Sequence, residues 1–155
     1  MIQYLTGDAA NPQIEGNKII AHICNDIGGW GKGFVVAISK RWKEPENEYR
    51  KWFKNGEHFQ LGEIQMVQVK ENIWICNMIA QHKTITSSKE VSPIRYEAVE
   101  KCLEKLSVEA LKLNAGIHMP RIGCGLAGGK WEAIEPIIER TLLNNEVEVY
   151  VYDFE

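Results

Sequence analysis

The stretch that decides the fold is MPRIGCGLAGG, which spans residues 119–129. Residues 117–119 predict a short buried strand, and a helical pattern begins near Lys130. Four glycines fall between them, within residues 123–129. Glycine lets backbone N–H groups approach an anion because no Cβ intervenes, and a helix N-terminus adds unpaired N–H groups and a favourable dipole. The stretch matches neither GxGxxG nor GxxxxGKS/T. It favours a phosphate-binding loop, and the alternative is a strand-to-helix turn without a ligand.

A second segment has the same arrangement. The apolar run at residues 19–24 predicts a buried strand, and four glycines follow within residues 28–33. A helical pattern then begins at Phe34 and continues to about Lys43. Glycine inside a helix or strand lowers stability by roughly 0.5–1 kcal/mol relative to alanine, so two dense clusters of glycine call for a functional or structural reason. We therefore expect two loops that close on one ligand from two sides.

Length and charge bound the class of protein. The 155 residues predict a single domain, residues 1–155, large enough to bury a core. A net charge of −3 argues against a surface that binds duplex nucleic acid. The chain shows neither a signal-peptide pattern nor an apolar run long enough to span a bilayer. We therefore expect a cytoplasmic protein without a membrane partner.

The cysteines do not have the spacing of a metal site. They stand at positions 24, 76, 102 and 124, far apart and without a CxxC pair. Three lie in or beside apolar strand patterns, where a free cysteine is usually a small buried hydrophobe. This favours buried free thiols in a reducing compartment. The sequence predicts no metal and no cofactor.

Strand and helix patterns alternate along the chain. Residues 64–69 and 73–80 predict a hairpin, and the polar segment 81–92 predicts a mobile surface loop. Alternation of this kind predicts a largely parallel sheet covered on both faces, with ligands beyond the carboxyl ends of its strands. Both glycine loops fall at that edge. The other predicted strands are 2–5, 19–24, 117–119 and 147–152, and the predicted helices are 33–43, 45–55, 93–114 and 130–143.

Three segments carry a family resemblance. TGDA at residues 6–9, NDIGGWGKG at 25–33 and PRIGCGL at 120–126 resemble a macrodomain. The resemblance covers nearly the whole chain and is closest to the branch of terminal ADP-ribose glycohydrolases and yeast-type ADP-ribose 1''-phosphate phosphatases. It implies a three-layer α/β/α sandwich with a mixed, largely parallel central sheet. It also implies that the ligand is ADP-ribose or an ADP-ribosylated substrate.

The resemblance also implies a set of binding residues. Asp8 matches an aspartate that bonds the adenine amino group; its alternative role is that of a turn aspartate. The first glycine loop would lie by the distal ribose and diphosphate, and the second would wrap the diphosphate from the other side. The predicted ligand-binding residues are Asp8, Ala9, Asn25, Gly28, Gly29, Trp30, Gly31, Gly33, Gly123, Cys124, Gly125, Leu126 and Ala127.

The catalytic residues of the glycohydrolase branch are missing from their expected places. That branch uses a lysine at the end of a central strand and an aspartate just after GCGL. Here Gln81 or a neighbour stands at the position of the lysine, Ala127 stands at that of the aspartate, and Lys83 is displaced by a residue or two. The lysine–aspartate mechanism is therefore not predicted for this chain.

Other groups are the predicted catalytic residues. Asn25 matches an asparagine that orients the distal ribose, Asp26 can activate a water as general base, and His22 matches a histidine of the phosphatase branch. A strand histidine such as His22 is also a common hydrogen-bonded core residue. Two positions are open for His82: it lies at the mouth of the pocket, or it is a solvated loop histidine.

Two further residues have alternative roles. Cys124 lies in the phosphate loop, where a thiol can be activated. No Cys-x5-Arg signature follows it, so we interpret it as a packing residue. Trp30 either covers the ligand or caps the core.

The sequence thus predicts a domain that binds ADP-ribose and hydrolyses a derivative of it, either an ADP-ribosyl ester or ADP-ribose 1''-phosphate. One alternative is a non-catalytic module that reads ADP-ribose on a partner. Another is a domain that binds a different adenine nucleotide or a nucleic-acid end.

Overall fold

The computed structural model describes residues 1–83, 93–125 and 127–154. Strands and helices alternate over most of the chain. In chain order the elements are β1 (Gln3–Thr6), β2 (Asn17–Asn25), α1 (Phe34–Arg41), α2 (Glu44–Asn55), β3 (Ile64–Lys70), β4 (Ile73–Gln81), α3 (Tyr96–Leu113), β5 (Ala115–Met119), α4 (Trp131–Thr141), the 3₁₀ turn η1 (Leu143–Asn145) and β6 (Val149–Asp153).

The strands of the described chain form one mixed sheet of order β1-β6-β5-β2-β4-β3. The predicted hairpin is confirmed, because β3 pairs antiparallel with β4. The other neighbouring strands are parallel. β2 lies inside the sheet, and its residues Ile19, Ile20 and Ala21 are fully buried. Such an unbroken apolar run is typical of a strand covered on both faces.

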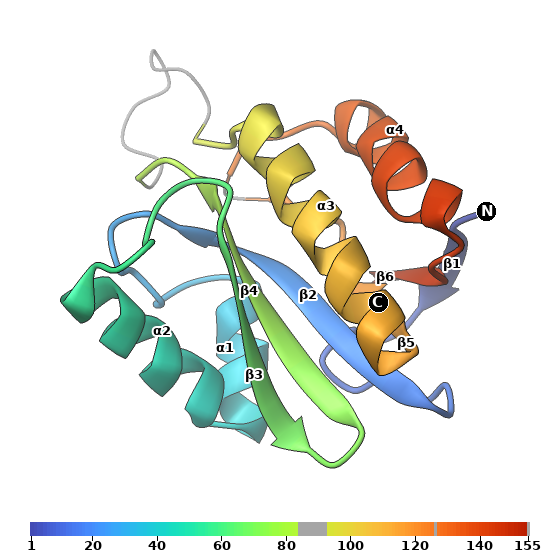
Figure 1. Cartoon of the computed structure of the whole chain (residues 1–155), viewed down its shortest axis with the longest axis horizontal. Coiled ribbons are helices and arrows are strands. Elements are labelled where there is room, and N and C mark those ends of the chain that lie inside the picture. Colours follow the sequence, from blue (N-terminus) through green and yellow to red (C-terminus); the bar gives the residue numbers. More distant parts are fainter. Residues whose placement is uncertain (84–92, 126, 155) are drawn as a thin grey trace.

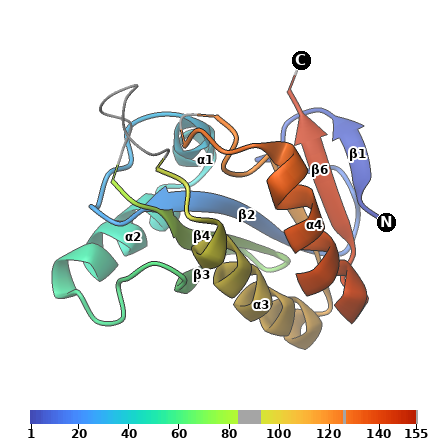
Figure 2. The ribbon, with the colours of Figure 1, turned by 90° about the horizontal axis from the view of Figure 1, so that it is seen from above.

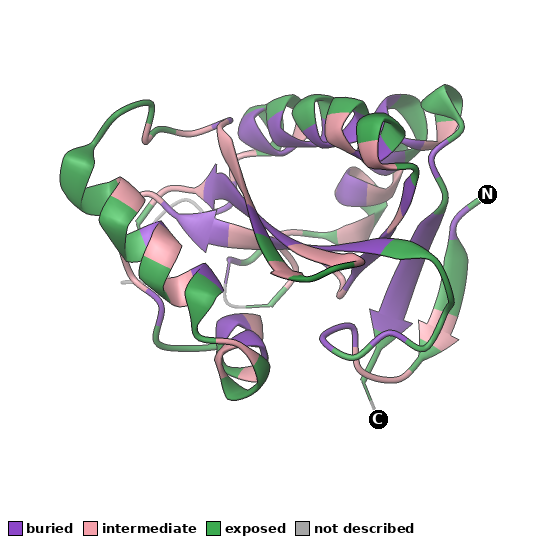
Figure 3. Cartoon of the chain, turned by 60° about the horizontal axis from the view of Figure 1, so that its bottom comes forward, coloured by how far each residue is buried: buried purple, intermediate pink, exposed green. Residues whose placement is uncertain are grey.

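The sheet is the middle of three layers. Figure 1 shows α3 and α4 crossing in front of the sheet, and Figure 2, seen from above, places α1 on the opposite side. Tyr49 of α2 belongs to the same hydrophobic cluster as Val35 and Ile38 of α1. The predicted α/β/α sandwich with a mixed, largely parallel sheet is therefore confirmed. Figure 3 shows that buried residues concentrate on the inner sides of the helices and along the central strands.

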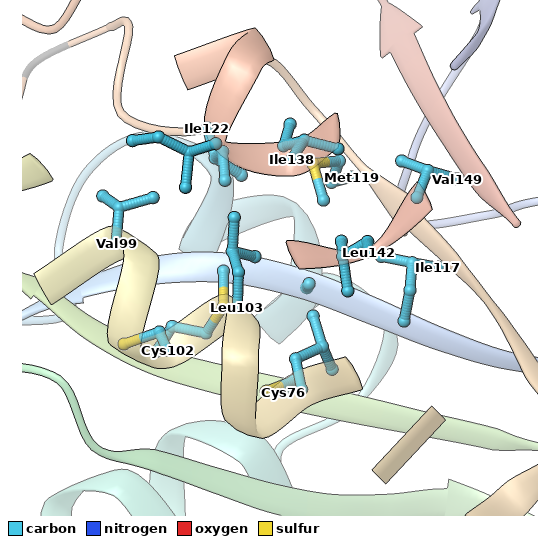
Figure 4. Close-up of a cluster of buried hydrophobic side chains, with 14 of the residues drawn as sticks. Cys76, Val99, Cys102, Leu103, Ile117, Met119, Ile122, Ile138, Leu142 and Val149 are labelled. Carbon is cyan, nitrogen blue, oxygen red and sulfur yellow. The ribbon is translucent and has the colours of Figure 1, made fainter. Parts of the chain in front are cut away.

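The larger core lies between the sheet and the pair α3 and α4. In Figure 4, Leu103 of α3 faces Ile117 and Met119 of β5, and Ile138 of α4 closes the same cluster. Each of these four side chains is fully buried. A smaller cluster on the other face joins the sheet to α1 and α2 and includes Tyr49. The site is thus positioned by a sheet that packs against helices on both of its faces.

The predicted start of helix α3 is wrong. The helix expected from residue 93 begins at Tyr96. Before it, Ile94 forms an isolated antiparallel bridge with Gln81. The chain therefore pairs with the end of β4 before it turns into α3, a long-range contact that proline-based helix signals do not reveal.

The polar loop predicted at residues 81–92 falls mostly outside the described residues, which resume at 93. The helix expected to reach residue 143 ends at Thr141, where the η1 turn follows.

The cysteines are free thiols, as predicted, and Cys24, Cys76 and Cys102 are buried. Burial raises the pKa of Cys102 to about 12, so that thiol stays protonated. Among the described residues, no group of three or more histidine, cysteine, aspartate or glutamate side chains is placed to hold a metal ion. None of the described helices is both long and apolar enough to cross a membrane.

Candidate functional site

A cavity of about 660 Å³ opens at the carboxyl ends of β2 and β5. Both glycine loops line it, together with the last residue of β4, so the two loops singled out from the sequence meet at one cavity. Its described lining residues are His22, Ile23, Cys24, Asn25, Gly29, Trp30, Gly31, Lys32, Gly33, Phe34, Val35, Gln81, Pro120, Arg121, Ile122, Gly123, Gly125 and Ala127.

The cavity gathers many of the predicted residues but not all of them. Of the predicted catalytic residues, His22 and Asn25 line it and Asp26 does not. Leu126 lies outside the described residues. The predicted binding residues in the lining are Asn25, Gly29, Trp30, Gly31, Gly33, Gly123, Gly125 and Ala127, whereas Asp8, Ala9, Gly28 and Cys124 lie outside it.

The carboxylate of Asp8 is used locally. Its Oδ1 accepts a hydrogen bond of 2.9 Å from the backbone N–H of Ala10, which is the geometry of an aspartate turn. Ala9 is 3% exposed and packs against Tyr150 and Tyr152, so it belongs to a small hydrophobic cluster. The structure thus gives Asp8 its turn role, and the adenine contact stays a prediction.

Asn25 shapes the first glycine loop. Its Oδ1 accepts from the backbone N–H of Ile27 (3.1 Å) and of Gly29 (2.9 Å), and its Nδ2 donates to the carbonyl of Gly29 (3.0 Å). A Cβ on Gly29 would lie 2.9 Å from Asn25 Nδ2, so the loop needs glycine there. The side-chain amide is therefore committed to the loop it starts.

Helix α2 holds this loop from behind. The buried Tyr49 hydroxyl donates to the carbonyl of Asn25 (2.7 Å) and lies 3.0 Å from its Oδ1. One turn later Phe53 packs so closely on Gly28 that a Cβ there would lie 2.5 Å from the ring. Gly28 also has a φ of 78°, a backbone conformation that favours glycine. The Arg50 Nη1 group donates to the Gly28 carbonyl (3.2 Å). Periodic side chains of α2 thus fix the loop, which the sequence pattern did not reveal.

We expect Tyr49→Phe to lower the free energy of unfolding by about 1–2 kcal/mol, because the buried backbone carbonyl of Asn25 loses the hydroxyl that donates to it. Urea denaturation followed by circular dichroism measures the change. Tyr96→Phe is the matched control, since the Tyr96 hydroxyl accepts a hydrogen bond at the exposed surface. Equal losses in the two variants would contradict a special role for Tyr49.

Asp26 pairs with a histidine from another element. Its Oδ2 lies 2.8 Å from Nδ1 of His82, and its Oδ1 accepts from the backbone N–H of Lys83 at 2.8 Å. The Asp26 side chain is 17% exposed and that of His82 is 44% exposed. This is the arrangement in which a carboxylate orients an imidazole, and it leaves His82 Nε2 available for another group. The pair adjoins Asn25 and Gln81, which both line the cavity.

The glycines of the second loop divide into two kinds. Gly129 N–H donates to the carbonyl of Gly123 (2.7 Å), and a Cβ on Gly129 would lie 2.5 Å from that oxygen. Gly123 has a φ of 75° and packs against Ile94. In contrast, a Cβ on Gly125 meets nothing within 4 Å. Gly123 and Gly129 therefore shape the loop, while Gly125 keeps space open at the cavity.

Sequence reasoning missed the cations of the lining, Lys32 and Arg121. The Arg121 guanidinium makes two hydrogen bonds to Asp153, of 2.5 and 2.9 Å, and this contact raises the pKa of Arg121. The same guanidinium lies over the rings of Tyr4 (5.1 Å) and Trp131 (5.2 Å). A cation inside a glycine loop, or directly before one, is the signal that could have identified both residues as candidates for the lining.

Curated proteins resemble the chain over nearly its full length, although no family model matches it. Chromodomain-helicase-DNA-binding protein 1-like from Mus musculus is 31% identical over 99% of the chain, which spans only 18% of that protein. The ADP-ribose 1''-phosphate phosphatase of Candida albicans is 30% identical, with 97% of the chain and 99% of the relative covered. The ADP-ribose glycohydrolase OARD1 of Homo sapiens is 27% identical over 97% of the chain and 90% of the relative.

Solved structures match still more closely. A protein of unknown function from Bacteroides thetaiotaomicron has a TM-score of 0.96 and 53% identity, with 99% of the chain and 98% of the neighbour covered. A macrodomain protein from Streptomyces coelicolor has a TM-score of 0.87 and 45% identity, with 99% of both chains covered. The two glycine loops therefore lie in a fold that is shared end to end with these proteins.

Proposed function

The chain belongs to the macrodomain family, and from that premise we propose that it binds ADP-ribose and hydrolyses a derivative of it, either an ADP-ribosyl ester or ADP-ribose 1''-phosphate. The observation that carries the proposal is the meeting of two glycine loops at one cavity beyond the carboxyl ends of β2 and β5. In parallel sheets this edge is where ligands bind.

The chemistry of the lining suits a diphosphate. Gly31 and Gly125 leave open space at the cavity, because a Cβ on either would meet nothing within 4 Å. Backbone N–H groups can approach phosphate oxygens at such positions. Lys32 adds positive charge to the lining, which also includes Arg121, whose guanidinium is held by Asp153. The apolar and aromatic remainder, which includes Trp30 and Phe34, can cover the less polar parts of a nucleotide.

The names of the relatives support the same ligand. The Candida albicans phosphatase and the human glycohydrolase differ in the bond they are named for, but both names contain ADP-ribose. We take ADP-ribose, the part that both names share, as the ligand. The turnover assay described below identifies the leaving group.

For catalysis we propose Asn25 and His22 at the cavity wall and Asp26 acting through His82. Both oxygens of Asp26 are engaged, and His82 Nε2 is the atom of the pair that has no hydrogen-bond partner among the described residues. In this proposal His82 exchanges a proton with the attacking water or the leaving oxygen, and Asp26 holds its ring.

The competing function is a non-catalytic reader of ADP-ribose on a partner. It is favoured by Gln81 and Ala127, which line the cavity and cannot act as acid or base. Turnover assays on ADP-ribose 1''-phosphate and on a protein carrying ADP-ribosyl esters separate the two functions. Release of phosphate or of ADP-ribose supports the enzyme, and binding without release supports the reader.

We expect ADP-ribose to bind with micromolar or better affinity, about −8 kcal/mol, and more tightly than AMP or GDP-ribose. AMP has no diphosphate, so it lacks the contacts that the two loops make with that group. GDP-ribose carries an oxygen where adenine has an amino group, so a site built for adenine binds it more weakly. Isothermal titration calorimetry with the three ligands measures this order. Equal affinity for AMP and ADP-ribose would contradict the two-loop diphosphate site.

We also propose that residues 1–155 act as a single macrodomain in the cytoplasm. The free thiols are typical of a reducing compartment. The net charge of −3 supports ADP-ribose or an ADP-ribosylated protein, rather than duplex nucleic acid, as the partner.

A further inference from the structure

His22 lies in the wall of the cavity with one ring nitrogen unused. The residue is 1% exposed, and its ring lies edge-on to Trp30 with ring centres 5.3 Å apart. Its Nε2 is 2.5 Å from Oδ1 of Asn77 on the neighbouring strand β4. Its Nδ1 has no hydrogen-bond partner among the described residues. Because buried polar atoms are nearly always paired, this orphaned nitrogen at a ligand cavity needs a reason.

The orientation of Asn77 is fixed by its own partners. Its Nδ2 donates to the backbone carbonyl of Pro45 (3.2 Å) and to Oε1 of Gln65 on β3 (2.9 Å). Gln65 is fixed in turn, because its Nε2 donates to the carbonyl of Glu48 (3.0 Å). Backbone carbonyls can only accept hydrogen bonds, so neither amide can turn round without placing oxygen against oxygen. Two carbonyls of α2 therefore anchor the whole chain of hydrogen bonds.

This chain of bonds decides which nitrogen of His22 carries the proton. Asn77 presents its oxygen to Nε2, so Nε2 must carry a proton and donate it. In the neutral ring Nδ1 is then unprotonated and can accept a hydrogen bond through its lone pair. The Cys24 sulfur lies 4.0 Å from the same Nε2 and is too distant to compete. Burial lowers the pKa of His22 to about 4, so the ring is neutral near pH 7.

We propose that Asn77, held by Gln65 and the Pro45 carbonyl, is a positioning residue that locks His22 as the Nε2–H tautomer, so that its Nδ1 accepts a hydrogen bond from a hydroxyl of the bound ligand. The inference rests on the proposed function, since ADP-ribose is the ligand it concerns. It also adds a specificity that the family resemblance does not supply. A phosphate oxygen has no proton to donate to Nδ1, whereas a ribose hydroxyl has one.

The tautomer can be read directly by nuclear magnetic resonance. Long-range ¹H–¹⁵N spectra of the ¹⁵N-labelled protein at pH 7 distinguish protonated from unprotonated ring nitrogens, and the signal of His22 is assigned by its loss in His22→Gln. We expect Nε2 protonated and Nδ1 unprotonated. Saturation with ADP-ribose should shift the Nδ1 resonance in the direction of an accepted hydrogen bond. A protonated Nδ1 in the free protein, or an Nδ1 resonance unmoved by bound ADP-ribose, would overturn the inference.

Asn77→Leu tests the positioning role. Without the amide oxygen, His22 should populate both tautomers, and affinity for ADP-ribose should fall about tenfold, the equivalent of one hydrogen bond. Asn72→Leu makes the same change in the partly exposed turn between β3 and β4 and should alter neither quantity. A pure Nε2–H tautomer in Asn77→Leu would show that Asn77 does not set it. If Asn77→Leu does not fold, the two wild-type spectra still test the predicted tautomer and the hydroxyl contact, and either result given above would overturn the inference.

The spectra also separate this inference from the proposed function. If calorimetry shows no binding of ADP-ribose, the proposed function and the hydroxyl contact fail together, while the tautomer still tests the role of Asn77. If ADP-ribose binds and Nδ1 does not respond, the proposed function stands and the contact is refuted.

Discussion

Gly125→Val should abolish ADP-ribose binding while leaving the domain folded. A Cβ at this position meets no atom of the described residues within 4 Å, so there is space for a side chain beside the backbone. The branched side chain would instead occupy space at the cavity that Gly125 lines. Against a micromolar wild type, we expect a loss of at least about a hundredfold, or roughly 3 kcal/mol. Calorimetry measures the affinity, and thermal unfolding measures the stability.

Gly129→Ala is the informative contrast. Its Cβ would lie 2.5 Å from the carbonyl oxygen of Gly123, so this smaller change must distort the loop and lower stability. Gly31→Val probes the first glycine loop, since a Cβ there also meets no atom of the described residues within 4 Å. A soluble Gly125→Val protein with unchanged ADP-ribose affinity would mean that the second loop is only a structural turn.

The sequence was sufficient for features that depend on local chemistry. Dense glycine at residues 28–33 and 123–129 predicted two loops at one edge of a sheet, and both line the same cavity. Alternating apolar segments predicted the layered sheet, and the adjacent segments 64–69 and 73–80 predicted the hairpin. In each case the feature is determined by a few neighbouring residues, through their backbone preferences and the period of their hydrophobic pattern.

The sequence was insufficient where distant residues meet. The pairing of Asp26 with His82 joins residues 56 positions apart. The bonds that orient His22 cross from β2 through β4 to β3. These contacts depend on strand order and register, which a single sequence does not contain. They also change the chemistry expected of each residue, because Asp26 no longer has a free oxygen and His22 is a neutral acceptor.

Asn25 has a structural role beside the catalytic role proposed for it. The residue lines the cavity as expected, yet all its side-chain hydrogen bonds run to its own loop and to Tyr49. Asn25→Ala should therefore lower both ligand affinity and turnover, since the loop loses its internal support. A variant of Asp26 should behave differently, because the Asp26 carboxylate holds His82 rather than the glycine loop.

For Asp26→Ala and His82→Ala we expect turnover to fall about a hundredfold each, the usual scale for losing an acid–base group. ADP-ribose affinity should persist, because backbone donors carry the diphosphate contact. The double variant should lose little more than either single variant, since the two residues act as one unit. Steady-state release of phosphate or ADP-ribose, measured beside calorimetry, provides both quantities. Fully additive losses would show that Asp26 and His82 do not act together.

Lys83→Ala provides the sharpest control, because Lys83 supports Asp26 only through its backbone N–H, which the substitution keeps. Its side chain, like that of Gln81, should matter little for turnover. If Lys83→Ala alone eliminates turnover while Asp26→Ala leaves it intact, the displaced lysine is the nucleophile and the Asp26–His82 assignment is reversed. If the wild-type protein binds ADP-ribose but releases nothing from esters or phosphates, the pair has no reaction to serve. The protein is then a reader whose Asp26–His82 contact ties the first glycine loop to the end of β4.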